Sequence, residues 1–361
     1  MGRDRRRLRP RPALLGVPRT ALVLSLAVAG VLVYTFVLRR GRTPELEGER
    51  SVASLETVRL GGAEQWVLIR GHDRSHPVVL FLHGGPGMPA MYLAHAWQRE
   101  LERDFVVVHW DRRGAGKSYS AAAGDDPLSV SQALADTYEL TQALRRRFGQ
   151  EPIYLVGHSW GSYLGLLIAR QHPECYAAYI GVGQLAGTRA EAEALRHRHV
   201  EHAAAQTGDE ETAARLAAGG PVTEDDLFRY GAELHAARSF WPLLWTGLLA
   251  PEYTLRDVLH VKRGADEVAR RMACDVLPRP LEGEVTRLEV PVFLFLGRHD
   301  YTTPSELAAA YAERLQAPFK EVTWFEHSAH FSFFEEPARF HTEMLRVVRA
   351  VHLLRAEVPG R

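Results

Sequence analysis

Short, largely apolar runs and longer amphipathic stretches alternate along two parts of this chain. The apolar runs are four to seven residues long and are bounded by turn-forming or polar residues, as is typical of buried strands; they occupy residues 78–82, 105–110, 153–156, 177–182, 290–296 and 321–325. Stretches with helical spacing lie between or after several of them, at residues 91–101, 128–148, 305–315 and 338–354. Two β-rich stretches at 57–60 and 65–70 predict a hairpin around Gly61-Gly62. The pattern predicts an α/β fold, a mostly parallel sheet with helices on both faces.

The alternation stops near Gln184 and resumes near residue 290. Residues 185–278 are rich in alanine and charged side chains and have helical patterning. An insertion at this point would lie over the carboxyl ends of the parallel strands, where such sheets bind ligands. We therefore expect four segments, namely an N-terminal segment with a linker (1–50), a first part of the α/β core (51–184), a helical cap (185–278) and a second part of the core (279–361).

An uncharged run from Ala21 to Leu38 marks the N-terminal segment. Seven arginines precede it and three follow it. Its eighteen residues are close to the roughly 20 that span a bilayer as a helix. Because more arginines precede the run than follow it, the N-terminus is expected on the cytoplasmic side. We therefore expect a transmembrane anchor at residues 21–38, with the rest of the chain extracytoplasmic. The alternative is a secreted protein after signal cleavage, because Ala27-Val28-Ala29 has the form of a cleavage site and Arg5–Leu8 resembles a twin-arginine signal.

Charge is distributed unevenly along the chain. Residues 1–42 contain ten arginines and one acidic residue, and because the formal net charge of the whole chain is zero, the remainder carries −9. An acidic body argues against nucleic acid as a partner. The two cysteines, Cys175 and Cys274, lack C-x-x-C spacing, and either one disulfide or two separate buried thiols would fit.

The motif Gly157-His158-Ser159-Trp160-Gly161 has the form G-x-S-x-G. It follows an apolar run and precedes a helix-compatible run, and strand–turn–helix is the setting of the nucleophile elbow in α/β-hydrolases. The two glycines leave room for the strand and the helix to approach each other around a strained turn. Ser159 is therefore the candidate nucleophile; the alternative is a glycine-rich turn without chemistry.

A nucleophilic serine needs a base, and the base needs an acid that orients it. Asp300 follows a predicted strand in a loop, where it can reach an imidazole, and it is the candidate acid; the alternative is a surface residue that caps the next helix. His327 and His330 both follow another predicted strand. We choose His330 as the base because the run His330–Pro337 resembles the H-F-x-x-x-E-E-P sequence that follows the catalytic histidine of many α/β-hydrolases.

An oxyanion needs backbone N–H donors, which in this kind of site come from the residue after the nucleophile and from the loop after an earlier strand. Trp160 is the first candidate donor. The second is Gly85, in the run His83-Gly84-Gly85-Pro86-Gly87 that directly follows the strand at 78–82. A plain glycine–proline turn is the alternative.

No cofactor is expected. Gly114–Ser118 resembles the end of a phosphate-binding loop, but Asp111 occupies the position that requires a glycine, so no nucleotide site is predicted. No metal is expected either, because three histidines on one predicted cap helix have no carboxylate or cysteine partner; they are His197, His199 and His202.

Three motifs together resemble the proline iminopeptidase-like branch of the α/β-hydrolase superfamily, a serine peptidase family. They are H-G-G-P-G at 83–87, W-D-x-R-G-x-G-x-S at 110–118 and G-x-S-W-G at 157–161. The resemblance covers residues 52–184 and 285–350. It implies an α/β-hydrolase fold with a helical cap and the triad Ser159, Asp300 and His330. It also implies that cap glutamates hold the free amine of the substrate; the candidates are Glu193, Glu201 and Glu233.

The resulting hypothesis is a serine hydrolase that works through an acyl-enzyme, an aminopeptidase of the proline iminopeptidase type acting on small peptides. A carboxylesterase or amidase acting on small acyl substrates is the first alternative. A non-catalytic binding protein of the same fold is an alternative of another class, although this chain keeps all three triad residues. Substrate contacts are expected from Gln184 and from the cap aromatics Trp241 and Trp245. The expected partner is a short peptide or another small molecule.

Overall fold

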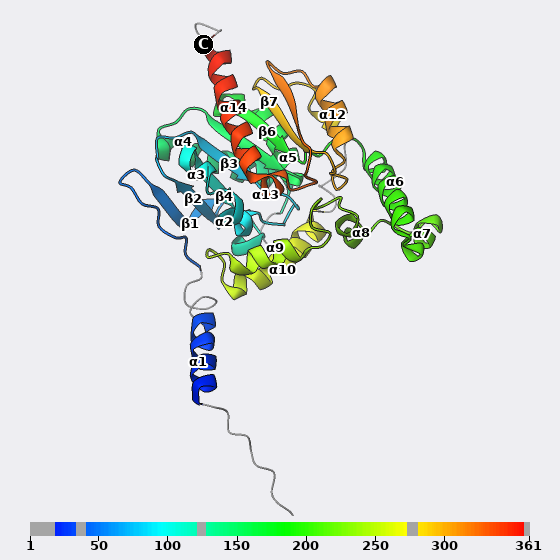
Figure 1. The fold of residues 1–361 in the computed structure, drawn as a ribbon. Coiled ribbons are helices and arrows are strands. Elements are labelled where there is room, and N and C mark those ends of the chain that lie inside the picture. Colours follow the sequence, from blue (N-terminus) through cyan, green and yellow to red (C-terminus); the bar gives the residue numbers. More distant parts are fainter. Residues whose placement is uncertain (1–18, 34–40, 121–127, 273–280, 357–361) are drawn as a thin grey trace, which may run out of the picture.

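The computed structural model describes residues 19–33, 41–120, 128–272 and 281–356. In this part of the chain eight strands form one sheet with the order β1-β2-β4-β3-β5-β6-β7-β8 (Figure 1). The strands are β1 (Val52–Leu60), β2 (Ala63–Gly71), β3 (Val78–Leu82), β4 (Val106–Trp110), β5 (Ile153–His158), β6 (Tyr176–Val182), β7 (Val292–Gly297) and β8 (Lys320–Phe325). β2 pairs antiparallel with β1 and β4, and all other neighbours pair parallel. The predicted hairpin is present, with Gly61 and Gly62 in its turn.

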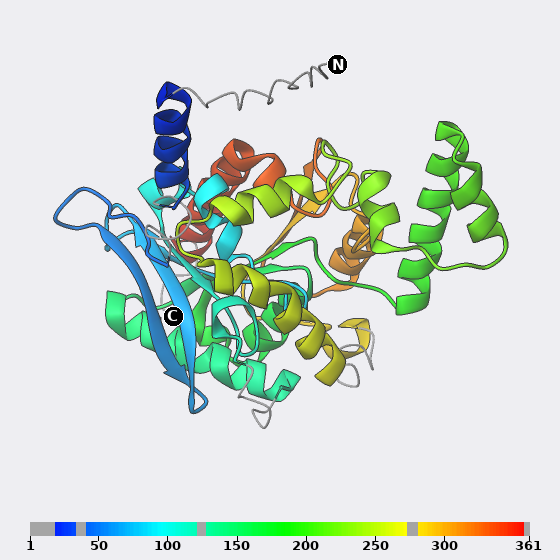
Figure 2. The same ribbon diagram turned by 90° about the horizontal axis from the view of Figure 1, so that it is seen from below.

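Helices cover both faces of the sheet (Figures 1 and 2). Because successive side chains of a strand point to opposite faces, Val78, Leu80 and Leu82 of β3 enter one core, whereas Val79 and Phe81 enter the other. The first core is closed by α4 (Val130–Phe148), α5 (Trp160–Gln171) and α12 (Ser305–Arg314). The second is closed by α2 (Ala94–Trp97), α3 (Leu101–Asp104), α13 (Ser332–Glu335) and α14 (Pro337–Ala356). The predicted architecture, a mostly parallel sheet with helices on both faces, is confirmed.

A group of helices separates β6 from β7 along the chain. They are α6 (Arg189–Thr207), α7 (Glu210–Ala217), α8 (Glu224–Arg229), α9 (Trp241–Leu249) and α10 (Leu255–Arg271), and the short α11 (Leu281–Glu284) follows them. In Figure 1, α8, α9 and α10 lie along one end of the sheet, and α6 and α7 lie further out. α10 packs against the loops that follow β3 and β4, so closely that a Cβ on Gly87 would lie 2.7 Å from Val268 and one on Gly264 would lie 2.4 Å from the Gly114 carbonyl. These helices therefore cover the carboxyl ends of the strands.

The N-terminal helix corrects one prediction. Helix α1 spans Arg19–Val33, 15 residues, in the described part of the chain. Among the described residues no helix has the length and the apolar character that a membrane crossing requires. The predicted transmembrane anchor at 21–38, and the extracytoplasmic location that depended on it, are therefore wrong; residues 34–38 of that segment lie outside the described residues.

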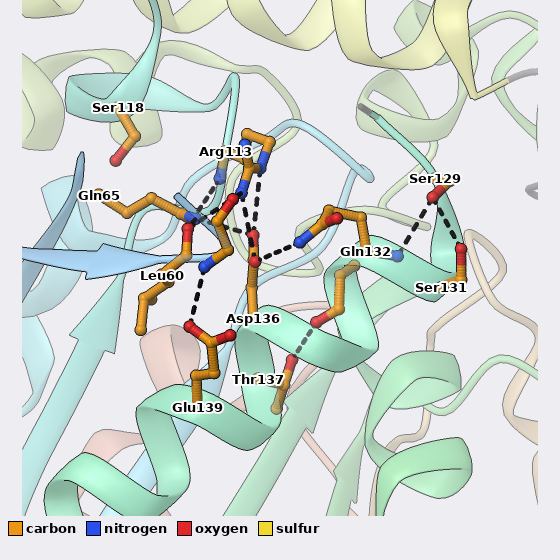
Figure 3. Close-up of polar contacts among 12 residues, drawn as sticks. Leu60, Gln65, Arg113, Ser118, Ser129, Ser131, Gln132, Asp136, Thr137 and Glu139 are labelled. Carbon is orange, nitrogen blue, oxygen red and sulfur yellow. Dashed lines mark hydrogen bonds and ion pairs between the residues drawn. The ribbon is translucent and has the colours of Figure 1, made fainter. Parts of the chain in front are cut away.

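The loop after β4 is held by a buried polar network (Figure 3). Arg113 pairs with Asp136 of α4 at 3.2 Å and donates to the Leu60 carbonyl at 3.0 Å. Gln65 of β2 donates to Asp136 at 2.7 Å and accepts from the Arg113 backbone N–H at 2.8 Å. Because buried charges persist in a fold only when they are paired and hydrogen-bonded, this network fixes one position for the loop and for the adjacent Arg112.

Cys175 is buried and has no disulfide partner among the residues that the structure describes. Cys274 lies outside those residues.

Candidate active site

Ser159 lies at the sharp turn between β5 and α5. Its backbone has φ 53° and ψ −126°, and every other positive φ among the described residues belongs to a glycine. Such a conformation is strained and persists only where the surroundings enforce it. A Cβ on Gly157 would lie 2.6 Å from the Gly161 carbonyl, and one on Gly161 would lie 2.2 Å from the Leu82 carbonyl. The two glycines of the motif are therefore required by the close approach of β3, β5 and α5.

The glycine loop after β3 lies directly against Ser159. A Cβ on Gly84 would be 2.8 Å from the Ser159 Cβ. Gly85 is exposed and has φ 109°, and a Cβ there would be 2.2 Å from the Met88 nitrogen. Trp160 is the first residue of α5, and N–H groups in the first turn of a helix have no partner in their own helix and carry its positive partial charge. The structure thus brings both candidate oxyanion donors to the region of the candidate nucleophile.

Asp300 and His330 form a buried hydrogen-bonded pair. The Nδ1 of His330 lies 2.9 Å from Asp300 Oδ2, and the two side chains are 3% (His330) and 0% (Asp300) exposed. Asp300 follows β7 and His330 follows β8, so two neighbouring strands deliver the pair to the carboxyl edge of the sheet. Ser159 belongs to the same edge, because its N–H donates to the Val182 carbonyl at 3.0 Å and the next residue, Gly183, lies against the pair.

The environment of His330 suits a base. Burial lowers its pKa, but the charge and hydrogen bond of Asp300 and the charge of Glu233 outweigh burial, so that the pKa is raised. The His330 carbonyl accepts from the Nε2 of His158, and the His330 N–H donates to the Glu233 carbonyl at 3.1 Å. His327, the other histidine considered, is exposed, and its backbone N–H donates to Glu336.

Arg112 is a buried residue that sequence reasoning did not select. It is 4% exposed, and burial lowers its pKa to about 9. Its Nη2 donates to the Gly84 carbonyl at 3.1 Å and to the Pro86 carbonyl at 2.7 Å, and the guanidinium lies 4.7 Å from the centre of the Trp160 ring. One cation therefore contacts both segments that carry the candidate oxyanion donors. Arg112 lies within the W-D-x-R-G motif, directly before the arginine of that motif, so the sequence did contain a signal for it.

Glu233 is the candidate cap glutamate whose backbone contacts the Asp300–His330 pair, because its carbonyl accepts from the His330 N–H at 3.1 Å. Burial raises its pKa, while the charge of His330 and a hydrogen bond from Thr302 oppose that rise. Glu193 and Glu201, the other two candidates, are exposed on α6 and pair with residues of their own helix, Arg189 and His197.

A cavity of about 530 Å³ lies between the cap and the loop after β3. Its walls are mostly apolar and aromatic and include Met88, Tyr92, Phe228, Phe240, Leu243 and Tyr253. Burial raises the pKa of Tyr92 in this wall, and the charge of Glu233 raises it further. A second cavity of about 520 Å³ lies around Arg70 and Glu252, and none of the candidate site residues lines either cavity.

Three predicted substrate contacts are not brought to this cavity. Trp241 and Trp245 stack on each other on the outer side of α9 and are 60% and 57% exposed. Gln184 is buried, where its Oε1 accepts from Tyr179 at 2.6 Å and its Nε2 donates to the Leu185 carbonyl at 2.8 Å, so both polar atoms are used within the core. Among the described residues no cluster of three or more histidine, cysteine or acidic side chains is arranged to hold a metal ion.

Comparison with known proteins places these motifs in a family. Residues 77–214 match the family model described as the alpha/beta hydrolase fold. The chain is 31% identical over 316 residues to a probable aminopeptidase, YbaC, of Bacillus subtilis (strain 168), covering 83% of this chain and 98% of that protein. It is 28% identical over 295 residues to a proline iminopeptidase of Levilactobacillus brevis, covering 75% and 88%.

Solved structures resemble the fold more widely. The crystal structure of a proline iminopeptidase-related protein from Thermus thermophilus superposes with a TM-score of 0.60 at 21% identity, covering 84% of this chain and 99% of the other. A proline iminopeptidase structure from Mycobacterium smegmatis has a TM-score of 0.58 at 21% identity, covering 83% and 99%. At these identities the likeness establishes the shared fold.

Proposed function

Because this chain belongs to the α/β-hydrolase family, in its proline iminopeptidase-like branch, we propose that it is a serine aminopeptidase that releases N-terminal residues from small peptides through an acyl-enzyme. The observation that carries the proposal is the buried Asp300–His330 pair at 2.9 Å on the same edge of the sheet as the strained Ser159. A pair of this kind at the same sheet edge as a serine on a sharp turn supports acyl transfer on any fold.

In the proposed mechanism Ser159 Oγ attacks the carbonyl of the N-terminal residue while the Nε2 of His330 takes its proton. Asp300 holds the other ring nitrogen and stabilises the imidazolium that forms. The N–H groups of Gly85 and Trp160 bind the oxyanion, each worth about 3 kcal/mol of barrier. His330 then gives the proton to the leaving amine, and water releases the acyl group by the same route in reverse order.

Glu233 supports the choice of a peptide with a free N-terminus. Its backbone carbonyl accepts from the His330 N–H at 3.1 Å, and its half-buried side chain accepts from the Thr302 hydroxyl. A substrate ammonium placed against this carboxylate would stabilise its charged form, which partial burial disfavours. The cavity between the cap and the loop after β3, mostly apolar and about 530 Å³ in volume, is suited to the side chain of the residue being released.

A matched panel of arylamides tests the proposal. Free prolyl, alanyl and leucyl arylamides are compared with their N-acetyl derivatives and with short acyl esters, using the wild type and Ser159→Ala. We expect turnover of the free arylamides, loss of at least about 100-fold in kcat/KM on acetylation, and no turnover by Ser159→Ala. Equal turnover of free and acetylated compounds, or esters preferred over both, would replace the aminopeptidase by an amidase or a carboxylesterase.

A further inference from the structure

Two consecutive threonines follow Asp300, and each hydrogen-bonds a different carboxylate. Thr303 contacts Asp300, the acid of the proposed triad. Thr302 donates from its hydroxyl to Glu233, the proposed amine-binding group. The turn between β7 and α12 therefore touches both acids on which the proposed reaction depends.

Thr303 supplies most of the hydrogen bonds that the Asp300 carboxylate receives. Its backbone N–H donates to Oδ1 at 2.9 Å and its hydroxyl lies 3.0 Å from Oδ2, and His330 provides the third contact. The Asp300 side chain is fully buried and Thr303 is 5% exposed. A buried carboxylate keeps its charge and its orientation only when such donors surround it.

The Thr303 hydroxyl also fills the gap between the acid and the base. Its oxygen lies 3.2 Å from His330 Nδ1 and 2.9 Å from the Gly183 carbonyl. The Thr303 hydroxyl has one proton, which it donates either to the Gly183 carbonyl or to Asp300 Oδ2. In both cases the hydroxyl oxygen remains within hydrogen-bonding distance of the Asp300–His330 pair. The hydroxyl therefore limits rotation of the carboxylate plane relative to the imidazole.

Thr302 is itself held in place by a cap helix. Its carbonyl accepts from Nε of Arg196 at 3.2 Å, and the neighbouring Tyr301 carbonyl accepts from the same Nε at 3.1 Å. Arg196 belongs to α6, so the cap holds the turn while the turn holds the Glu233 side chain. Thr302 does not hydrogen-bond Asp300, and Thr303 does not hydrogen-bond Glu233, in the described part of the chain.

We propose that the two threonines are separate positioning residues, Thr303 for the triad acid and Thr302 for the carboxylate that recognises the substrate amine. The inference rests on the proposed function, and it divides that function into two parts that one turn controls independently. Turnover chemistry depends on Thr303, and preference for a free N-terminus depends on Thr302.

The test uses Thr303→Val and Thr302→Val, which are nearly equal in shape to threonine, and the conservative variants Thr303→Ser and Thr302→Ser. Two readouts are compared with the wild type, namely kcat and KM on a free aminoacyl arylamide and the rate at which a fluorophosphonate labels Ser159. The labelling reagent has no amine, so its rate reports the triad and not the recognition of an N-terminus.

We expect Thr303→Val to lower kcat and the labelling rate together by about tenfold or more with KM little changed, and Thr303→Ser to recover most of both. Thr302→Val should raise KM for the free arylamide by about tenfold, with the labelling rate within about twofold of wild type, and Thr302→Ser should restore KM. The opposite pattern, or the same profile for both valine variants, overturns the division of roles, as does wild-type behaviour of both.

These outcomes are distinct from failure of the proposed function. If Ser159 is labelled but no arylamide is hydrolysed, the aminopeptidase activity fails while the labelling rate of Thr303→Val still decides the role of Thr303. If the valine variants fold poorly, the serine variants are measured in their place. Serine keeps the hydroxyl, so a serine variant that loses the wild-type labelling rate or KM contradicts a role for that hydroxyl.

Discussion

Replacing Arg112 tests how the oxyanion donors are held in place. Its guanidinium donates to the Gly84 and Pro86 carbonyls, one on each side of Gly85, and lies over the Trp160 ring. Arg112→Met keeps the approximate length of the side chain and removes every donor. We predict a loss of both stability and turnover, for two different reasons.

The magnitude for stability follows from what the substitution leaves behind. The Pro86 carbonyl loses its charged donor, which costs about 1–3 kcal/mol, whereas the Gly84 carbonyl keeps a contact with His83 Nδ1 at 2.9 Å. Arg112 is 4% exposed, and burial lowers its pKa to about 9. Removing the desolvation cost of this buried cation offsets part of the loss. The expected net loss in the free energy of unfolding is about 1 kcal/mol.

The expected loss of kcat depends on how far the Gly85 N–H is displaced from the oxyanion. A misplaced oxyanion donor costs about 3 kcal/mol of barrier, or roughly 100-fold in kcat. Arg112→Lys, which retains a charge but can approach only one carbonyl at a time, should fall between the wild type and Arg112→Met. The assay is kcat and KM on a free aminoacyl arylamide, with thermal unfolding measured in parallel.

Arg113→Met is the matched control. Arg113 is the next residue and is buried as well. It has an ion pair with Asp136, and its guanidinium donates to the Leu60 and Gly61 carbonyls, away from the Gly84–Pro86 loop. Arg113→Met should lose more stability than Arg112→Met, about 3–5 kcal/mol, because it leaves Asp136 buried without its partner, and should keep kcat within about threefold. If Arg112→Met and Arg113→Met lose equal amounts of kcat, or if Arg112→Met changes only KM, the reasoning about oxyanion positioning is refuted.

Three further predictions concern the rest of the site. Gly183→Ala should lower kcat by at least about tenfold, because Gly183 has φ 51° and a Cβ there would lie 2.8 Å from His330 Nδ1; unchanged kcat in a folded variant would contradict the geometry. Asp300 and Glu233 raise the pKa of His330, and protonated His330 cannot accept the serine proton. As the pH falls, kcat/KM should therefore decline with a midpoint above the usual histidine pKa of about 6.5. Glu233→Gln should move this midpoint to lower pH; an unchanged midpoint would show that Glu233 does not act on His330. Trp245→Ala should leave KM unchanged and stability within about 0.5 kcal/mol, because the side chain is exposed outside the cavity; a large rise in KM would return Trp245 to the substrate site.

The strands and the elbow could be predicted because their signals are local. A buried parallel strand is a short apolar run, and Ser159 is flanked by glycines that the turn itself requires. Asp300 and His330 follow strands whose order brings their carboxyl ends together. Position after the strand selected Asp300, whereas the choice of His330 over His327 also needed the resemblance of the run His330–Pro337 to a known family sequence.

The cap could not be predicted at the same level. In α9 the buried positions are Leu243 and Gly247, and the stacked Trp241 and Trp245 lie on another side of the helix. An apolar helix with aromatic residues on several sides does not indicate which side packs inward. The same limit left three glutamates as candidates, because the choice of Glu233 depends on tertiary contacts with His330 and Thr302.

The prediction of a membrane anchor in the N-terminal segment was wrong for a different reason. The absence of charge from Ala21 to Leu38 measures only what the residues lack, whereas a membrane span also requires a continuous helix of sufficient length. Among the described residues α1 spans Arg19–Val33, and no described helix is long and apolar enough to cross a membrane. The positioning roles proposed for Thr303 and Arg112 were missed because the distance from a side chain to a carbonyl or carboxylate on another loop has no signature in the order of residues.

Labelling with a fluorophosphonate, followed by digestion and mass spectrometry, tests the central claim most directly. If Ser159 is activated by the Asp300–His330 pair, the reagent should form one adduct, on the peptide that contains Ser159, and labelling should disappear in Ser159→Ala and slow by several orders of magnitude in His330→Ala. Labelling that persists in Ser159→Ala, or that proceeds at the wild-type rate in His330→Ala, would contradict the proposed nucleophile and its base.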